Sequence, residues 1–125
     1  METISTYEAE SLLPRVINMI IQCHGSKNKI TASQIVTELL EVHGITANEA
    51  RIRKVINFLR TTDRIKCLVA TSTGYYIAET KEDVEEYIQS LKSREEAIKE
   101  TRESIERQYH SAFSHNQQFQ IPKLF

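Results

Sequence analysis

Glycine is scarce in this chain, with three among 125 residues. Gly-rich phosphate-binding loops and the sharp turn that presents a nucleophilic serine both need glycines at fixed spacing. Neither pattern occurs in the sequence. Most carboxylates fall in a polar C-terminal segment, where we expect them to be solvated rather than catalytic. The sequence therefore predicts a protein that is not an enzyme and that needs no cofactor.

Paired cysteines and long apolar runs are also missing. Cys23 and Cys67 lie far apart, and with His24 and His43 they match no zinc-site spacing, so we expect no metal. No apolar run approaches the roughly 20 residues that cross a bilayer. The first five residues lack the basic and apolar regions of a secretory signal. We therefore expect a cytoplasmic protein with reduced thiols and no membrane partner.

Positive charge is concentrated in the middle of the chain, although the net charge is −1. Residues 45–66 carry six Lys and Arg side chains and two Asp and Glu side chains. Attraction to a polyanion depends on such a local excess and not on the charge of the whole chain. The central segment is therefore the candidate for contact with nucleic acid.

Apolar periodicity and end signals predict three helices before residue 63. The first covers residues 11–24, with Gly25 as its stop. The second begins after Thr31, whose capping box is completed by Gln34, and ends at Gly44. We expect its buried face to contain Ile35, Val36, Leu39, Leu40 and Val42.

The third predicted helix covers residues 46–62, with Thr46 as its cap and Glu49 at the capping-box position. At 100° per residue, its apolar side consists of Ile52, Val55, Ile56 and Leu59. Its opposite side carries Arg53, Lys54 and Asn57, while Arg51 and Arg60 flank the apolar stripe. A short Gly-containing link joins it to the second helix, as in a helix-turn-helix.

A β-hairpin is predicted next, from the runs 65–70 and 75–78 around the polar turn 71–74. Cys67 would alternate to the core side of the first strand. The order helix, helix-turn-helix and hairpin, with Gly74-Tyr75-Tyr76-Ile77-Ala78 leading into a charged helix, resembles small winged-helix DNA-binding proteins of bacteriophages, prophages and other mobile elements. The resemblance covers residue 12 to about residue 93, and it implies that 46–62 is the recognition helix and 71–74 the wing tip.

Double-stranded DNA is the partner that this resemblance implies. Arg53, Lys54 and Asn57 would read bases in the major groove, and Arg51, Arg60, Arg64 and Lys66 would hold phosphates. The wing tip itself carries no Lys or Arg, so the helix would supply most of the readout. The alternatives are a solvated helix face and a protein-docking module.

A fourth helix is predicted over residues 81–113, with Thr80 as its cap and Asp83 at the box position. Apolar side chains recur every seven residues, at Val84, Leu91, Ile98, Ile105 and Ala112. This spacing favours a homodimer through a coiled coil, although the accompanying seam positions include Glu95 and Arg102. The alternative is a single solvated helix that folds back on the domain.

The last six residues, Gln120-Ile121-Pro122-Lys123-Leu124-Phe125, resemble peptides that bind the bacterial sliding clamp. In that interpretation Gln120 would hydrogen-bond at a pocket rim, and Leu124 and Phe125 would bury apolar area. The alternative is an apolar tail that packs on its own domain or on a dimer mate. The sequence thus leaves open a partner protein of the replisome.

Together these patterns predict a mainly α protein with a small hairpin: a winged helix-turn-helix over 1–80, a long helix over 81–113 and an extended tail over 114–125. We expect a sequence-specific DNA-binding protein, a phage-type regulator or replication factor. The alternative function is a non-catalytic adaptor in phage replication that docks through the C-terminal peptide.

Overall fold

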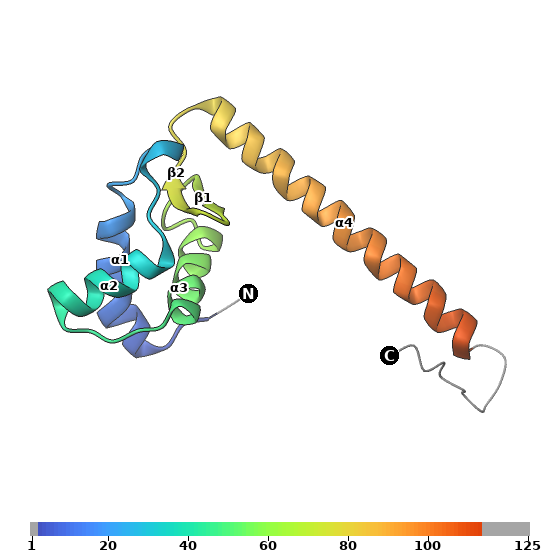
Figure 1. The fold of residues 1–125 in the computed structure, drawn as a ribbon, viewed down its shortest axis with the longest axis horizontal. Coiled ribbons are helices and arrows are strands. Elements are labelled where there is room, and N and C mark those ends of the chain that lie inside the picture. Colours follow the sequence, from blue (N-terminus) through green and yellow to red (C-terminus); the bar gives the residue numbers. More distant parts are fainter. Residues whose placement is uncertain (1–2, 114–125) are drawn as a thin grey trace. The chain divides into compact units, whose positions relative to one another are not determined.

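The computed structural model describes residues 3–113, which are mostly helical with one two-stranded hairpin. The chain divides into two units, Met1–Glu85 and Glu86–Phe125. In the first unit, α1 (Leu13–Ile20), α2 (Ala32–His43) and α3 (Glu49–Thr61) pack together, and the hairpin of β1 (Leu68–Thr71) and β2 (Gly74–Ile77) lies at one end of them (Figure 1). A π-helical turn, Glu8–Leu12, precedes α1, and a 3-10 turn, Ser26–Asn28, precedes α2. The helix α4 (Lys81–Phe113) follows the hairpin.

The core of the first unit is built from one apolar face of each of these elements. Ile52, Val55, Ile56 and Leu59 of α3 are buried, as the periodicity of the sequence predicted. Burial of a side chain of this size stabilises the fold by about 1.5–3 kcal/mol. The largest side chains in this core with less than 2% exposure are Leu12, Ile20, Ile35, Leu39, Ile52, Ile56, Leu59, Leu68, Val16 and Val55.

The first helical segment starts and ends earlier than predicted, running from Glu8 through Ile20 rather than over 11–24. The helix does not continue to residue 24, because residues 23–25 pair with β2 instead. The amide of Ile77 donates to the carbonyl of Cys23 at 2.7 Å, and the amide of Gly25 donates to the carbonyl of Ile77 at 2.9 Å. Long-range pairing thus replaces the last predicted turn of helix.

The start of α2 follows the predicted capping box. The amide of Gln34 donates to Thr31 Oγ1 at 3.0 Å, and the amide of Thr31 donates to Gln34 Oε1 at 2.8 Å. Gly44 ends the helix with a left-handed φ of 65°. The predicted buried face was too wide, because Leu40 and Val42 are 54% and 67% exposed. They lie outside the sector that faces α1 and α3.

The start of α3 differs from the prediction. Asn48, not Thr46, is the cap, and its Oδ1 accepts from the amide of Arg51 at 2.8 Å. Asn is at least as good a cap as Thr. The choice follows from packing, since Ile45 and Ala47 are partly buried against the core and keep the link extended up to residue 48.

The hairpin is antiparallel and shorter than predicted, with Leu68 opposite Ile77 and Thr71 opposite Gly74. Cys67 is exposed and has a φ of 59°, so the prediction that it lies on the core side of a strand was wrong. A turn occupies residues 62–67 instead, and the amide of Arg64 donates to the carbonyl of Leu59 at 3.1 Å.

The segment before α2 extends the hairpin on its β2 side. Ile30 and Tyr75 exchange two backbone hydrogen bonds of 2.9 and 2.8 Å, and His24 forms a bridge with Ile77. An isolated two-stranded hairpin is at best marginally stable in water. Residues 23–30 therefore anchor β2 to the helical part of the unit.

The helix α4 has the predicted bounds. Thr80 Oγ1 accepts from the amide of Asp83 at 3.1 Å, while the Asp83 carboxylate accepts from the amide of Glu79 at 3.3 Å. Within residues 3–113, no helix combines the length and the apolar character that crossing a membrane requires.

Candidate nucleic-acid interface

The helix α3 separates an apolar face from a cationic one. Its four buried residues fix its rotation about the axis, so that the remaining positions lie toward solvent or toward neighbouring segments. Asn48 and Glu49 at its start satisfy a free amide and complement the positive end of the helix dipole. The predicted contact residues of this helix fall into two groups on either side of its exposed face.

The first group, Arg51 and Lys54, is bound by a carboxylate from the N-terminal segment. Arg51 Nε lies 2.9 Å from Glu8 Oε2, and Lys54 Nζ lies 3.1 Å from Glu8 Oε1. Glu8 is 2% exposed, whereas the two cationic side chains are about 39% and 37% exposed. The Arg51 guanidinium also lies 5.0 Å from the centre of the Tyr7 ring. Lys54, which the helical wheel places on the outward side of the helix, is thus held by an ion pair with Glu8 and is partly buried.

The charge of Glu8 is strongly favoured in this position. The backbone N–H of Ser5 donates to Glu8 Oε1 at 2.8 Å and makes the largest contribution to the lowering of the Glu8 pKa to about 2. Burial acts in the opposite direction, and the hydrogen bonds from Arg51 and Lys54 lower the pKa further. A carboxylate with these partners remains ionised at neutral pH.

The second group lies on the hairpin side of α3. Arg53 Nη2 is 3.1 Å from Glu49 Oε1, and this pair is exposed. Asn57 Oδ1 accepts from Arg60 Nη2 at 2.9 Å. Burial raises the pKa of Tyr75, and the positive charges of Arg53 and Arg60 partly offset that effect. The charges of α3 thus reach the start of β2.

A pocket of about 220 Å³ joins the N-terminus of α2, the first turns of α3 and the hairpin turn. We call this the helix–hairpin pocket. Hydroxyl groups, one cation and one carboxylate face it, which makes it polar and open to hydrogen bonding. Its lining residues are Thr31, Ala32, Ser33, Glu49, Arg53, Thr71, Ser72, Thr73, Gly74 and Tyr75.

Arg64 and Lys66 follow α3 in the chain. The Arg64 guanidinium lies 5.1 Å from the centre of the Phe58 ring. Both side chains belong to exposed residues in the turn before β1. They therefore present charge beside the hairpin rather than on the helix.

Lys29 supplies a cation at the hairpin turn that the sequence interpretation missed. Its Nζ donates to Thr73 Oγ1 at 2.8 Å, although the two residues are 44 positions apart. The turn itself has no basic residue, but the loop before α2 places one against it. Nothing in the local sequence marks this contact, because it depends on the pairing of Ile30 with Tyr75.

Glu8 was also missed, and here the sequence contains a usable signal. Ser5 and Glu8 match the S-x-x-E capping-box pattern. The amide of Glu8 donates to Ser5 Oγ at 3.1 Å, which completes the reciprocal pair. The pattern identifies Glu8 as a helix-start residue, but its contact with α3 spans more than 40 positions and has no local signature.

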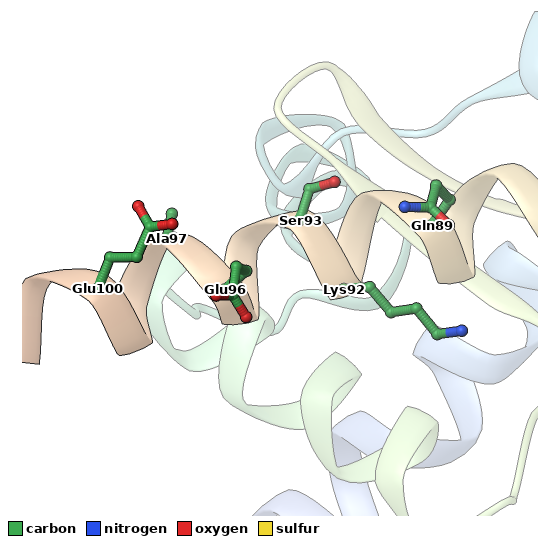
Figure 2. Close-up of a pocket in the computed structure, with 6 residues that line it drawn as sticks. All are labelled: Gln89, Lys92, Ser93, Glu96, Ala97 and Glu100. Carbon is green, nitrogen blue, oxygen red and sulfur yellow. The ribbon is translucent and has the colours of Figure 1, made fainter. Parts of the chain in front are cut away.

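Other parts of the described chain offer less for binding chemistry. Within residues 3–113, no three His, Cys, Asp or Glu side chains gather as metal ligands would. A shallow site of about 510 Å³ lies along α4, and all the side chains that line it come from this one helix (Figure 2). They are Gln89, Lys92, Ser93, Glu96, Ala97 and Glu100. The predicted tail contacts Gln120, Leu124 and Phe125 lie outside the described residues.

No protein-family model, curated protein or solved structure matches this chain. The resemblance to phage-type winged-helix proteins therefore rests on residue patterns alone.

Proposed function

We propose that the N-terminal unit is a winged helix that binds double-stranded DNA sequence-specifically, as a phage-type regulator or replication-associated protein of the cytoplasm. The observation that carries this proposal is the division of α3 into a fully buried apolar face and an exposed cationic face beside a hairpin. A helix that is anchored in this way can enter the major groove without exposing core residues.

Arg53 is the main base-reading residue in this proposal. Its guanidinium is exposed and forms a solvent-exposed ion pair with Glu49. Such a pair contributes about 0.2–1 kcal/mol and is easily exchanged for contacts with a guanine edge. Asn57 lies one turn further along α3, at a spacing suited to an adjacent base pair.

Arg51 and Lys54 hold the DNA backbone in this proposal and do not read bases. Glu8 restrains both side chains on one edge of α3, so they lack the freedom to follow a base edge into the groove. Their exposed atoms can still donate to phosphate oxygens. Arg60, Arg64, Lys66 and Lys29 extend the same type of contact toward the hairpin.

Selection from a randomised duplex library tests the proposal directly. We expect an enriched sequence, with an affinity that decreases steeply as salt increases because bound phosphates release counterions. A chain that enriches no sequence and shows no salt-dependent binding would contradict the proposed function.

Substitution of Arg53 tests the orientation of the interface. Arg53→Ala should cost about 1–3 kcal/mol of binding to the selected duplex and relax the preference at one base position. The matched control is Arg107→Ala, which removes the same charge from an exposed position of α4. Equal losses in both variants would exclude a specific role for α3.

The dimer is part of this proposal. We assign the second copy to the exposed face of α4, since a regulator that binds two half-sites normally presents two recognition helices.

A further inference from the structure

The helix α4 carries a row of apolar side chains that remain open to solvent. Ile98, Ile105 and Tyr109 are 69%, 56% and 59% exposed, and Ile88 and Leu91 belong to the same face. Singly exposed apolar residues are common, but a contiguous row at helical spacing marks an interaction surface.

Two parallel rows make up this face, each with a spacing of seven residues. The first row is Leu91, Ile98, Ile105 and Ala112. The second row starts with Ile88 and ends with Tyr109, and between them it contains Glu95 and Arg102. Opposite charges at two equivalent seam positions carry information about the orientation of a partner helix.

We propose that α4 pairs with α4 of a second copy in the antiparallel orientation, with Glu95 of each chain beside Arg102 of the other. This inference rests on the dimer in the proposed function and adds its direction and its register. The occupant of the apolar face is thus a second copy of this chain.

The parallel orientation brings like charges together. Equivalent positions face each other in a parallel, in-register pair. Glu95 would then oppose Glu95, and Arg102 would oppose Arg102, both at the seam. Along the edge of the seam, Arg94 of each chain would also lie next to Lys99 of the other. Each of these contacts is repulsive, and none is compensated by an attractive one between the same positions.

The antiparallel orientation resolves these conflicts. A pair that is centred near residue 100 places Ile88 against Ala112 and Leu91 against Tyr109 of the second copy. In this register Glu95 faces Ile105 and Arg102 faces Ile98 of the second copy. Glu95 and Arg102 of opposite chains therefore occupy adjacent layers, and the twofold axis repeats the contact.

The existing partner of Arg102 is compatible with this second contact. Arg102 Nη1 lies 2.6 Å from Glu106 Oε1, with both side chains 57% exposed, so the guanidinium has further N–H groups that can donate to a second carboxylate. Lys92 of the second copy would approach Glu106 from the edge of the seam. The one like-charge contact in this arrangement is between the two Lys99 side chains, which lie beside the axis.

Crosslinking distinguishes the two orientations. Single cysteines are placed in a chain with Cys23→Ser and Cys67→Ser, and a short bismaleimide is added in the absence of DNA. Lys99→Cys should give a crosslinked dimer, because the two Lys99 positions meet across the antiparallel pair. Glu95→Cys should give little, since its copies lie nearly three turns apart, about 15 Å along the axis.

The crosslinking results and the mass together test the dimer, its orientation and its register. Crosslinking through Glu95→Cys alone indicates a parallel pair and overturns the orientation while the dimer stands. A monomeric mass by sedimentation overturns the dimer and the orientation with it. A dimeric mass with neither crosslink overturns this register. DNA binding is measured separately, so a failure of the proposed DNA-binding function leaves these results interpretable.

Charge exchange gives an independent test. Glu95→Arg should weaken the dimer by about tenfold or more, because two attractive contacts become repulsive. Adding Arg102→Glu should restore the dissociation constant toward the original value. In a parallel pair the same exchange leaves like charges opposed, so neither variant would show this pattern. Glu100→Arg, on the outer side of α4, is the matched control and should leave the dissociation constant unchanged.

Discussion

Glu8 connects the N-terminal segment to α3 through a single buried carboxylate. The geometry makes Arg51 and Lys54 dependent on it, so its charge stabilises the fold and also holds two predicted DNA contacts in place. A buried charge that loses its partners is expensive, and two half-exposed cations without their carboxylate return to solvent. The effect of removing Glu8 is therefore measurable in stability and in binding.

We expect Glu8→Gln to lower the free energy of unfolding by about 2 kcal/mol at neutral pH, because charged hydrogen bonds are lost. The pH dependence has a definite sign. The pKa of Glu8 is lowered from 4.5 to about 2 on folding, so its contribution is present above pH 4.5 and disappears as the pH falls toward 2. Urea unfolding of both proteins across this range should show their stabilities converge. A constant difference down to pH 2 would contradict the assignment.

Gly74 occupies a position that excludes a side chain. It has a φ of 141°, and a Cβ would lie 3.0 Å from both the carbonyl oxygen of Ile30 and the Cβ of Lys29. We expect Gly74→Ala to destabilise the unit by about 2 kcal/mol and to displace the hairpin from Lys29.

Gly44→Ala is the matched control for this substitution. Gly44 also has a positive φ, of 65°, but a Cβ there would meet no atom within 4 Å. The backbone strain alone should cost about 1 kcal/mol. Equal losses of stability in the two variants, measured by urea unfolding, would show that the contact with Ile30 is unimportant.

Among the elements, the start of a helix was predictable where a capping side chain close in sequence determines it. Thr31 and Thr80 both act as the caps that local patterns indicated. The start of α3 was mispredicted because Thr46 and Asn48 are both competent caps, and the packing of Ile45 decides between them. Local sequence contains no record of that packing.

The candidate interface was predictable only where local periodicity determines it. The buried face of α3 can be predicted from its apolar periodicity. The exposure of Arg53 follows because Arg53 lies on the opposite side of the helix. The contacts of Glu8 and Lys29 could not be predicted, since each joins segments more than 40 residues apart. Such contacts depend on the arrangement of the helices and not on any one of them.

The capping box of α2 provides a test at the scale of one element. Thr31→Ala should lower the free energy of unfolding by about 1 kcal/mol, because the amide of Gln34 loses its acceptor. Thr37→Ala, at an exposed position inside the same helix, should change it by less than about 0.5 kcal/mol. Thermal unfolding of both variants is sufficient to compare them. A loss in Thr37→Ala as large as that in Thr31→Ala would rule out capping as the cause.

For the whole molecule, stability and assembly should respond to different residues. Ile98→Asp introduces a charge on the exposed face of α4, at a position that is 69% exposed. We expect a loss of the dimer by sedimentation, with the unfolding midpoint of the first unit unchanged.

In the same variant, binding to a duplex with two half-sites should respond differently from binding to a single half-site. Affinity for a duplex with two half-sites should fall by at least tenfold, while affinity for a single half-site should remain, because only linked binding benefits from two copies. An equal decrease for both duplexes would indicate that α4 contributes to the contact with DNA itself.

The anchoring of β2 by residues 23–30 defines which part of this protein can be exchanged as a module. The hairpin is contiguous in sequence, but its hydrogen-bonded neighbours Ile30 and Cys23 lie before α2. A chimera that grafts residues 68–77 alone into another scaffold would carry β2 with unpaired amides at Tyr75 and Ile77. The smallest transferable piece is therefore discontinuous, and recombination at any point between residues 31 and 67 would separate its two halves.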